Sequence, residues 1–208
     1  MKKILAILLS LCMAISLAGC GGAESPSKVT DRFFKAIKDK DAETISKLYE
    51  GDDIDLSEIG EELSDLSDED TSLMDKEVQS RLIDMMFDFD YEIGDEEIDG
   101  DNAVVKVKMT SYALGDVMSA FYTDFMAWAL ENLFSNVSEA ETTEKASEIL
   151  IEKLDEAEKT YTEEIEVKLV KKDNEWIVSK DTDVTGLLNV MTGNLAGTIE
   201  NIANALDE

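Results

Sequence analysis

Apolar residues near the start of the sequence recur at helical spacing. Val29, Phe33 and Ile37 lie four residues apart, which predicts an amphipathic helix over residues 27–38. Asp41 then stands where it can cap a second, shorter helix in the residues that follow. This part of the chain therefore predicts two helices joined by a tight turn.

The next segment is acidic but keeps a helical pattern. Residues 52–70 hold ten acidic residues and no basic one, and apolar residues recur among them at steps of three and four. A solvated helix with one apolar face fits this spacing better than an acidic tail does. Ser72 and Asp75 have capping-box spacing and predict a further helix. The apolar stripe of that helix consists of Met74, Val78, Leu82 and Met86.

The period then changes from four to two, which is typical of half-buried strands. The apolar side of the first strand is formed by Phe87, Phe89, Tyr91 and Ile93. Asp99 and Gly100 supply a turn, and a second strand follows over residues 103–109. On the outer face of this pair, Lys106 and Lys108 are expected to face the acidic residues of the first strand. Those acidic residues are Asp88, Asp90 and Glu92.

Helical spacing returns over residues 116–159 and predicts a helical insertion. A second hairpin follows, with its turn at Asp173 and Asn174. From Asp183 to the end of the chain the apolar spacing is again three or four, which predicts helix. We assign residues 195–208 to a C-terminal amphipathic helix.

This order of elements predicts an α+β domain over residues 27–194. Its expected architecture is a curved antiparallel sheet of two hairpins, packed on N-terminal helices, with the helical insertion between the hairpins. The stretches FFKAIKDKDA at residues 33–42 and KKDNEWIV at residues 171–178 resemble exported domains of the nuclear-transport-factor-two-like superfamily, the cystatin-like cone. The resemblance implies a concave sheet face. In related enzymes that face holds an Asp or His acid/base, but no motif assigns such a residue here.

The first twenty residues have the pattern of an export signal. An uncharged and mostly apolar run at residues 4–18 follows two lysines and spans about 23 Å as a helix, short of the ~30 Å bilayer core. This favours a cleaved signal peptide, residues 1–19, over a permanent span. LAGC at residues 17–20 resembles a bacterial lipobox, which implies a diacylglyceryl lipid on the sulfur of Cys20. Residues 20–26 are expected to form a flexible tether. With this lipobox and the cone-like stretches, the chain resembles uncharacterised lipoproteins of Gram-positive bacteria.

Composition narrows the classes of function. The chain has 19 basic and 48 acidic residues, a net charge of -29, and loss of the two leader lysines makes it -31. Such a field repels nucleic acid and argues against anionic lipid headgroups as direct ligands. The absence of histidine excludes serine or cysteine catalysis through a histidine partner. The mature chain keeps one cysteine and therefore forms no internal disulfide.

The first hairpin carries part of a calcium-binding motif. Asp95, Glu97, Asp99 and Gly100 partly match the start of an EF-hand loop. Lys106, however, occupies the position at which that loop needs a bidentate glutamate. We therefore predict no metal site and no cofactor.

Three other sets of residues are candidate sites. Asp88 and Asp90 share one strand face and are either a carboxylate pair or ordinary exposed acids beside lysines. An aromatic run in the insertion lines an apolar pocket or belongs to the core; it comprises Phe121, Tyr122, Phe125 and Trp128. The C-terminal stripe is expected to dock on its own chain rather than on a partner. It comprises Leu195, Ile199, Ile202 and Leu206.

These observations favour a non-enzymatic module held by the lipid on Cys20 at the extracytoplasmic face of the bacterial membrane. Its expected ligand is a small apolar molecule or an envelope protein, and nucleic acid is not expected to bind. The alternative is an envelope hydrolase or isomerase with an Asp or Glu base of raised pKa in the concave pocket. A solute receptor is disfavoured, because one cone lacks the two hinged lobes that close around solute.

Overall fold

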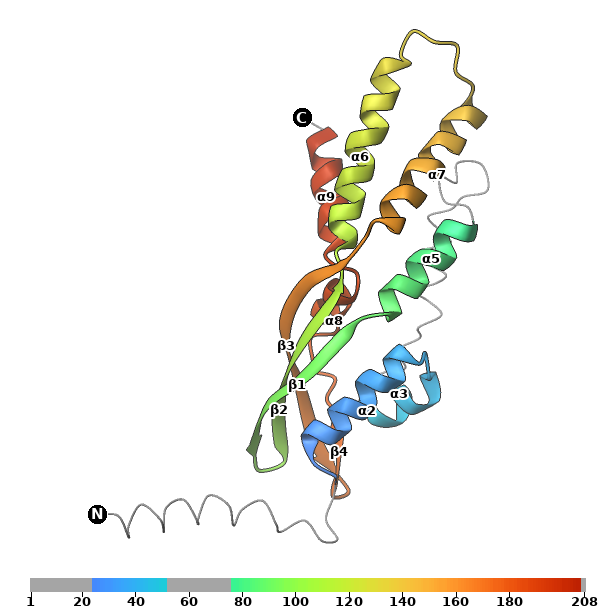
Figure 1. Cartoon of the computed structure of the whole chain (residues 1–208). Helices are drawn as coiled ribbons and strands as arrows, with labels where there is room; N and C mark the ends of the chain where they lie inside the picture. Colours follow the sequence, from blue (N-terminus) through green and yellow to red (C-terminus); the bar gives the residue numbers. More distant parts are fainter. Residues whose placement is uncertain (1–23, 52–75, 207–208) are drawn as a thin grey trace, which may run out of the picture.

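The computed structural model describes residues 24–51 and 76–206, and within them four antiparallel strands form one open sheet in the order β1-β2-β3-β4. Helices precede the first hairpin, lie between the two hairpins and follow the second (Figure 1). The predicted α+β class and the helical insertion between hairpins are confirmed.

The two N-terminal helices form where the spacing predicts them. α2 spans Pro26–Lys38, with proline in its first turn, where the missing N–H costs nothing. α3 spans Ala42–Leu48, and the side chain of Asp41 accepts a hydrogen bond from the Thr44 backbone N–H at 3.1 Å. Asp41 is thus the predicted cap.

The start of the first strand differs from the prediction. α5 spans Lys76–Phe87, and β1 begins only at Asp90 and runs to Asp99. Phe87 closes the helix because it lies four residues after Ile83 and continues the buried stripe, while the Asp88 N–H still bonds the Asp84 carbonyl. Phe87 fits both the helical and the strand period, and in the structure it belongs to the helix.

β2 spans Asn102–Tyr112 and pairs with β1 through a turn at Gly100, whose φ is +62°. Its inward residues are buried as predicted: Ala103, Val105, Val107 and Met109. Lys108 lies opposite Glu92, also as predicted. Lys106 instead pairs with Glu164 of β3 at 3.7 Å, because the register shift after Ile93 interrupts β1 beside it.

The insertion is a pair of helices, α6 at Leu114–Glu131 and α7 at Glu139–Asp155, which we call the arm. Figure 1 shows the arm projecting beyond the sheet as two roughly antiparallel helices. The chain then returns through β3, Lys159–Lys172, and β4, Glu175–Val178. Asp173 and Asn174 both have positive φ, so the predicted turn is confirmed.

The C-terminal part is two helices rather than a continuous one. α8 spans Val184–Met191 and α9 spans Leu195–Leu206. Gly193 and Asn194 between them have φ values of +53° and +60°, which a helix cannot contain. The break lets α9 run along α6 (Figure 1), and Leu195 packs against the core. Ile199 of the same stripe is 43% exposed, so docking of the whole stripe on its own chain stays a prediction.

The core lies between the inner sheet face and the helices that cover it. Its largest fully buried side chains are Phe33, Phe34, Phe89, Ile45, Met109, Leu114, Leu169 and Met191. Phe34 of α2 contacts three other aromatic rings at this core: Phe33, Phe89 just before β1 and the partly buried Tyr91 of β1.

Several predictions fall on residues outside the described ranges. These are the signal peptide, the lipobox with Cys20, the first part of the tether, the acidic helix at residues 52–70 and the capping box of Ser72 and Asp75. Among the helices of residues 24–51 and 76–206, none combines the length and apolarity needed to cross a bilayer.

Candidate functional site

The arm carries the aromatic run singled out in the sequence. Phe121, Phe125 and Trp128 recur at steps of four and three on α6, so their rings lie along one side of the helix. Phe121 and Phe125 stack at 5.8 Å between centroids, and Phe125 and Trp128 stack at the same distance. All three, with Tyr122, are half-buried. The rings cover one another in a ladder, and the predicted pocket at these residues stays a prediction.

The far end of the arm exposes large apolar side chains. Leu130 is 66% exposed, Leu133 64% and Phe134 99%, and we call these three residues the arm end. Phe134 belongs to the turn after α6, and Ser138 then starts α7 with a complete capping box to Glu141. The cap fixes where α7 begins, so Leu133 and Phe134 lie in the turn between α6 and α7 and belong to neither helix. A cluster of this kind marks an interaction surface more often than isolated exposed residues do.

The sequence pattern alone missed the arm end. Leu130 and Leu133 continue the apolar spacing of α6, and that spacing predicts burial. α6 has 18 residues and α9 has 12, and the two start together at the Gly115–Gly193 hydrogen bond of 3.0 Å. At 1.5 Å per residue α6 outreaches α9 by roughly 9 Å. Among the helices of the described residues, the upper part of α6 therefore has only α7 beside it.

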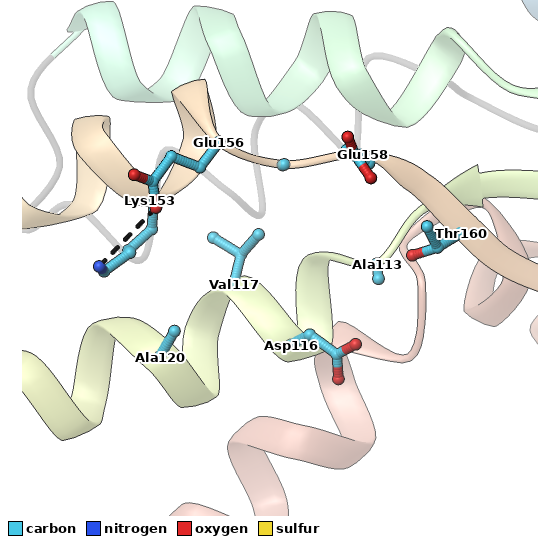
Figure 2. Close-up of a pocket in the computed structure, with 9 residues that line it drawn as sticks. Ala113, Asp116, Val117, Ala120, Lys153, Glu156, Glu158 and Thr160 are labelled. Atoms are coloured by element: carbon cyan, nitrogen blue, oxygen red, sulfur yellow. Dashed lines mark ion pairs between the residues drawn. The ribbon is translucent and has the colours of Figure 1, made fainter.

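A small hollow lies at the base of the arm instead (Figure 2). It measures about 250 Å³ and is lined by Ala113, Asp116, Val117, Ala120, Lys153, Glu156, Ala157, Glu158 and Thr160. Lys153 Nζ lies 2.7 Å from Asp124 Oδ2 and 3.9 Å from Glu156 Oε2. The hydrogen bond to Asp124 raises the pKa of Lys153, so this amine stays protonated at neutral pH. It joins α6 to α7 and is unsuited to act as a base.

The carboxylate pair of the sequence analysis has different partners from those expected. Asp88 Oδ1 lies 2.6 Å from Lys159 Nζ, and Asp90 Oδ2 lies 3.6 Å from the same nitrogen. Lys159, with Lys38 at 4.0 Å from Asp90, takes the place predicted for Lys106 and Lys108. The hydrogen bond from Lys159 lowers the pKa of Asp88. Asp88 and Asp90 therefore form ion pairs with lysines and do not form a carboxylate pair with each other.

Acidic groups elsewhere show the same trend. Where the pKa of a described carboxyl group departs from its ordinary value, it is lowered; these groups are Asp31, Asp41, Glu50, Asp88 and Glu141. The buried polar residues of the described chain are serines and threonines. Within residues 24–51 and 76–206, no three potential ligands gather into a metal site, and Asp95, Glu97 and Asp99 lie on β1.

The arm end and the start of the described chain lie at opposite extremities. Glu24 lines a hollow together with Glu175 and Trp176 of β4. Figure 1 places β4 and the first turn of α2 at the foot of the molecule and the α6–α7 turn at its head.

Comparison with known proteins gives one solved structure of similar shape. It is the crystal structure of YcdA from Bacillus subtilis, a protein described there as a candidate lipoprotein. The TM-score is 0.51 at 16% sequence identity, over 79% of this chain and 55% of YcdA. At this identity the likeness shows the fold alone, and the chain spans about half the length of YcdA. No family model and no curated protein sequence matches the chain.

Proposed function

We propose that this chain is a lipid-anchored protein of the bacterial envelope that binds another envelope protein through its arm end. The observation that carries the proposal is the placement of three exposed apolar side chains, Leu130, Leu133 and Phe134, at the extremity opposite the first turn of α2. The stacked ladder of α6 supports that extremity from below.

The anchor in this proposal rests on the sequence. LAGC at residues 17–20 resembles a lipobox at the end of an export signal, and the similar protein YcdA is itself described as a candidate lipoprotein. Two acyl chains at about 0.8 kcal/mol per buried CH₂ hold a protein on a membrane essentially permanently. The resemblance to nuclear-transport-factor-two-like domains stays a prediction, since the comparison adds no support to it.

The partner in this proposal is a protein with an apolar cleft and basic surroundings. Burial of a large apolar side chain contributes roughly 1.5–3 kcal/mol, so three such side chains can carry a stable contact. Glu131, Glu139 and Glu141 stand on the same arm and favour a basic rim. A lipid surface fits less well, because the acids disfavour anionic headgroups and the α6–α7 turn lies at the opposite extremity from the first turn of α2.

A small apolar ligand at the ladder has less support. The rings of Phe121, Phe125 and Trp128 already stack on one another. Catalysis by a carboxylate also gains no support from the described residues, because the shifted pKa values go down rather than up. The proposed role is therefore binding.

The anchor is tested by Cys20→Ala in the bacterium that makes the protein. The expected result is loss of the lipid and release of the chain from the membrane fraction. A variant that stays as firmly membrane-bound as the native chain contradicts the proposed anchor.

The binding role is tested with a photo-crosslinking amino acid placed at Phe134, compared with the same probe at Asp99 of the β1–β2 turn. We expect a defined protein adduct from position 134 in living cells and none from position 99. Equal adducts at both positions, or none at position 134, contradict the proposal.

A further inference from the structure

Part of β3 has no neighbouring strand on one side. β3 has 14 residues and β4 has four, and the two pair only between residues 169–172 and 175–178. β2 covers the other side of β3 from Lys159 to Val170. Among the described residues, none adds a backbone hydrogen bond to residues 160–167 from the open side.

Two hydrogen bonds fix which backbone groups point to that open side. Lys171 N–H bonds the Asp101 carbonyl, toward β2. Lys168 N–H bonds Thr182 Oγ1 at 3.1 Å on the opposite side, where its carbonyl accepts from Ser179 N–H at 2.8 Å. Because backbone direction alternates along a strand, the next even-numbered residues also present N–H and C=O to the open side. These residues are Thr162, Glu164 and Glu166, which we call the free edge.

The free edge adjoins a hollow that can receive a chain. The hollow measures about 320 Å³ and is lined by Glu163, Glu164, Ile165, Glu166, Lys168, Asp183 and Gly186. Its far wall is the start of α8, where Asp183 caps the Gly186 N–H at 2.8 Å. The other sheet edge differs, because the β1 pairing carries a register shift after Ile93. A bulge of this kind discourages strand addition, and the register of β3 at the free edge has none.

We propose that the free edge binds an extended basic segment of another protein as an added β-strand. Main-chain hydrogen bonds would supply affinity, and Ile165, half-buried in the hollow, would contact one side chain of the added strand. This second surface is independent of the proposed role of the arm end.

Charge decides the occupant. Glu163, Glu164 and Glu166 line the hollow from β3, with Asp183 across it and Lys168 as the one basic lining residue. Lys106 of β2 pairs with Glu164, which leaves the other three acids to set a negative charge. A second copy of the chain pairing through the same edge would bring these glutamates together, and like charges opposite each other destabilise a pair. Residues 52–70, with ten acids and no base, would meet the same repulsion. A lysine-rich segment would be attracted by the acidic side chains and could also form hydrogen bonds with the backbone groups of the free edge.

The test uses the intact protein, purified in mild detergent, and an eight-residue peptide of alternating lysine and valine. Binding is measured by calorimetry, together with amide hydrogen exchange at Glu164 and Glu166. We expect binding with slowed exchange at both amides. The same peptide with alternate backbone nitrogens methylated keeps its charge but loses its donors, and we expect it to bind about tenfold more weakly.

A pair of variants separates backbone pairing from charge. Glu166→Pro removes one outward N–H at a position where proline is tolerated, and Glu166→Thr removes the same charge but keeps the N–H. We expect Glu166→Pro to weaken binding about tenfold relative to Glu166→Thr. Equal binding by the two variants overturns the proposal. So does equal binding of the methylated peptide to the native chain, a result that needs no variant to fold.

Discussion

The body of the molecule and its arm use aromatic residues in different ways. In the body Phe33, Phe34 and Phe89 are at most 1% exposed, and Phe34 contacts the other two rings inside the core. In the arm the rings of α6 are half-buried, and Phe134 at its end is 99% exposed. The body rings therefore contribute to folding. The ladder contributes less, and Phe134 contributes little, which leaves it available for contact.

The way each region is held explains this contrast. The body rings lie between a sheet and several helices. The arm is joined to the body at its base, where α6 packs against α9 and α7 packs against α5, and where Arg81 of α5 pairs with Asp155 of α7. Regions with fewer buried contacts open at lower free energy, so the arm is expected to be the less stable region.

The largest expected effect is a core truncation in the body. Phe34→Ala removes a fully buried ring that contacts three other rings, and we expect a loss of about 3–5 kcal/mol in the free energy of unfolding. Phe125→Ala, the matched truncation in the ladder, is expected to cost about 1–2 kcal/mol. Urea unfolding followed by circular dichroism measures both. Equal losses would remove the distinction between body and arm.

The next effect concerns the joint between the regions. A Cβ on Gly193 would overlap the Tyr112 carbonyl oxygen, and its φ is +53°. We expect Gly193→Ala to cost at least about 2 kcal/mol of unfolding free energy. Gly100→Ala is the control: its φ is +62° but the space around it is open, so about 1 kcal/mol is expected. A Gly193 variant no less stable than the Gly100 variant would contradict the close crossing.

The smallest stability effect is electrostatic and lies in the body. Lys159 lowers the pKa of Asp88, so the pair stabilises the fold above the unfolded-state pKa near 4 and loses this contribution as pH falls through the lower, folded-state pKa. Asp88 is 53% exposed, so Asp88→Asn should cost at most about 1 kcal/mol at pH 7. We expect this difference from the native chain to shrink in acid and to be smaller in a Lys159→Met background. A difference that grows in acid would reverse the assigned sign.

The sequence predicted most of the fold because two periods are easy to tell apart. The alternation of β2 and the helical spacing of α2 each placed the right residues in the core. Phe87 was assigned wrongly because it fits both periods. Lys106 was paired wrongly because a shift of register leaves no clear trace in the pattern. The C-terminal helix was assigned its observed start at residue 195, but the contact of Gly193 with Tyr112 could not be predicted, because the two residues are distant in sequence.

The candidate surfaces were harder to predict, since each depends on what is missing beside a residue. Leu130 and Leu133 have the spacing of buried residues, but they are exposed because α9 is shorter than α6 and because Leu133 lies in the turn before α7. The free edge of β3 likewise results from a long strand paired with a short one. Sequence periodicity reports which residues share a face, but it does not report which faces find a partner.

The most direct test of the proposed binding role is made at the arm end. A photo-crosslinking amino acid at Ser135 leaves the three apolar residues intact, and the measurement is adduct yield in living cells with and without Leu130→Ser, Leu133→Ser and Phe134→Ser combined. Because these side chains are exposed, the triple variant should keep its unfolding free energy within about 0.5 kcal/mol and stay in the membrane fraction. We expect the adduct yield of the triple variant to fall at least about tenfold, which corresponds to a loss of about 1.4 kcal/mol of binding free energy. An undiminished adduct from a folded, anchored triple variant would contradict the proposed binding role.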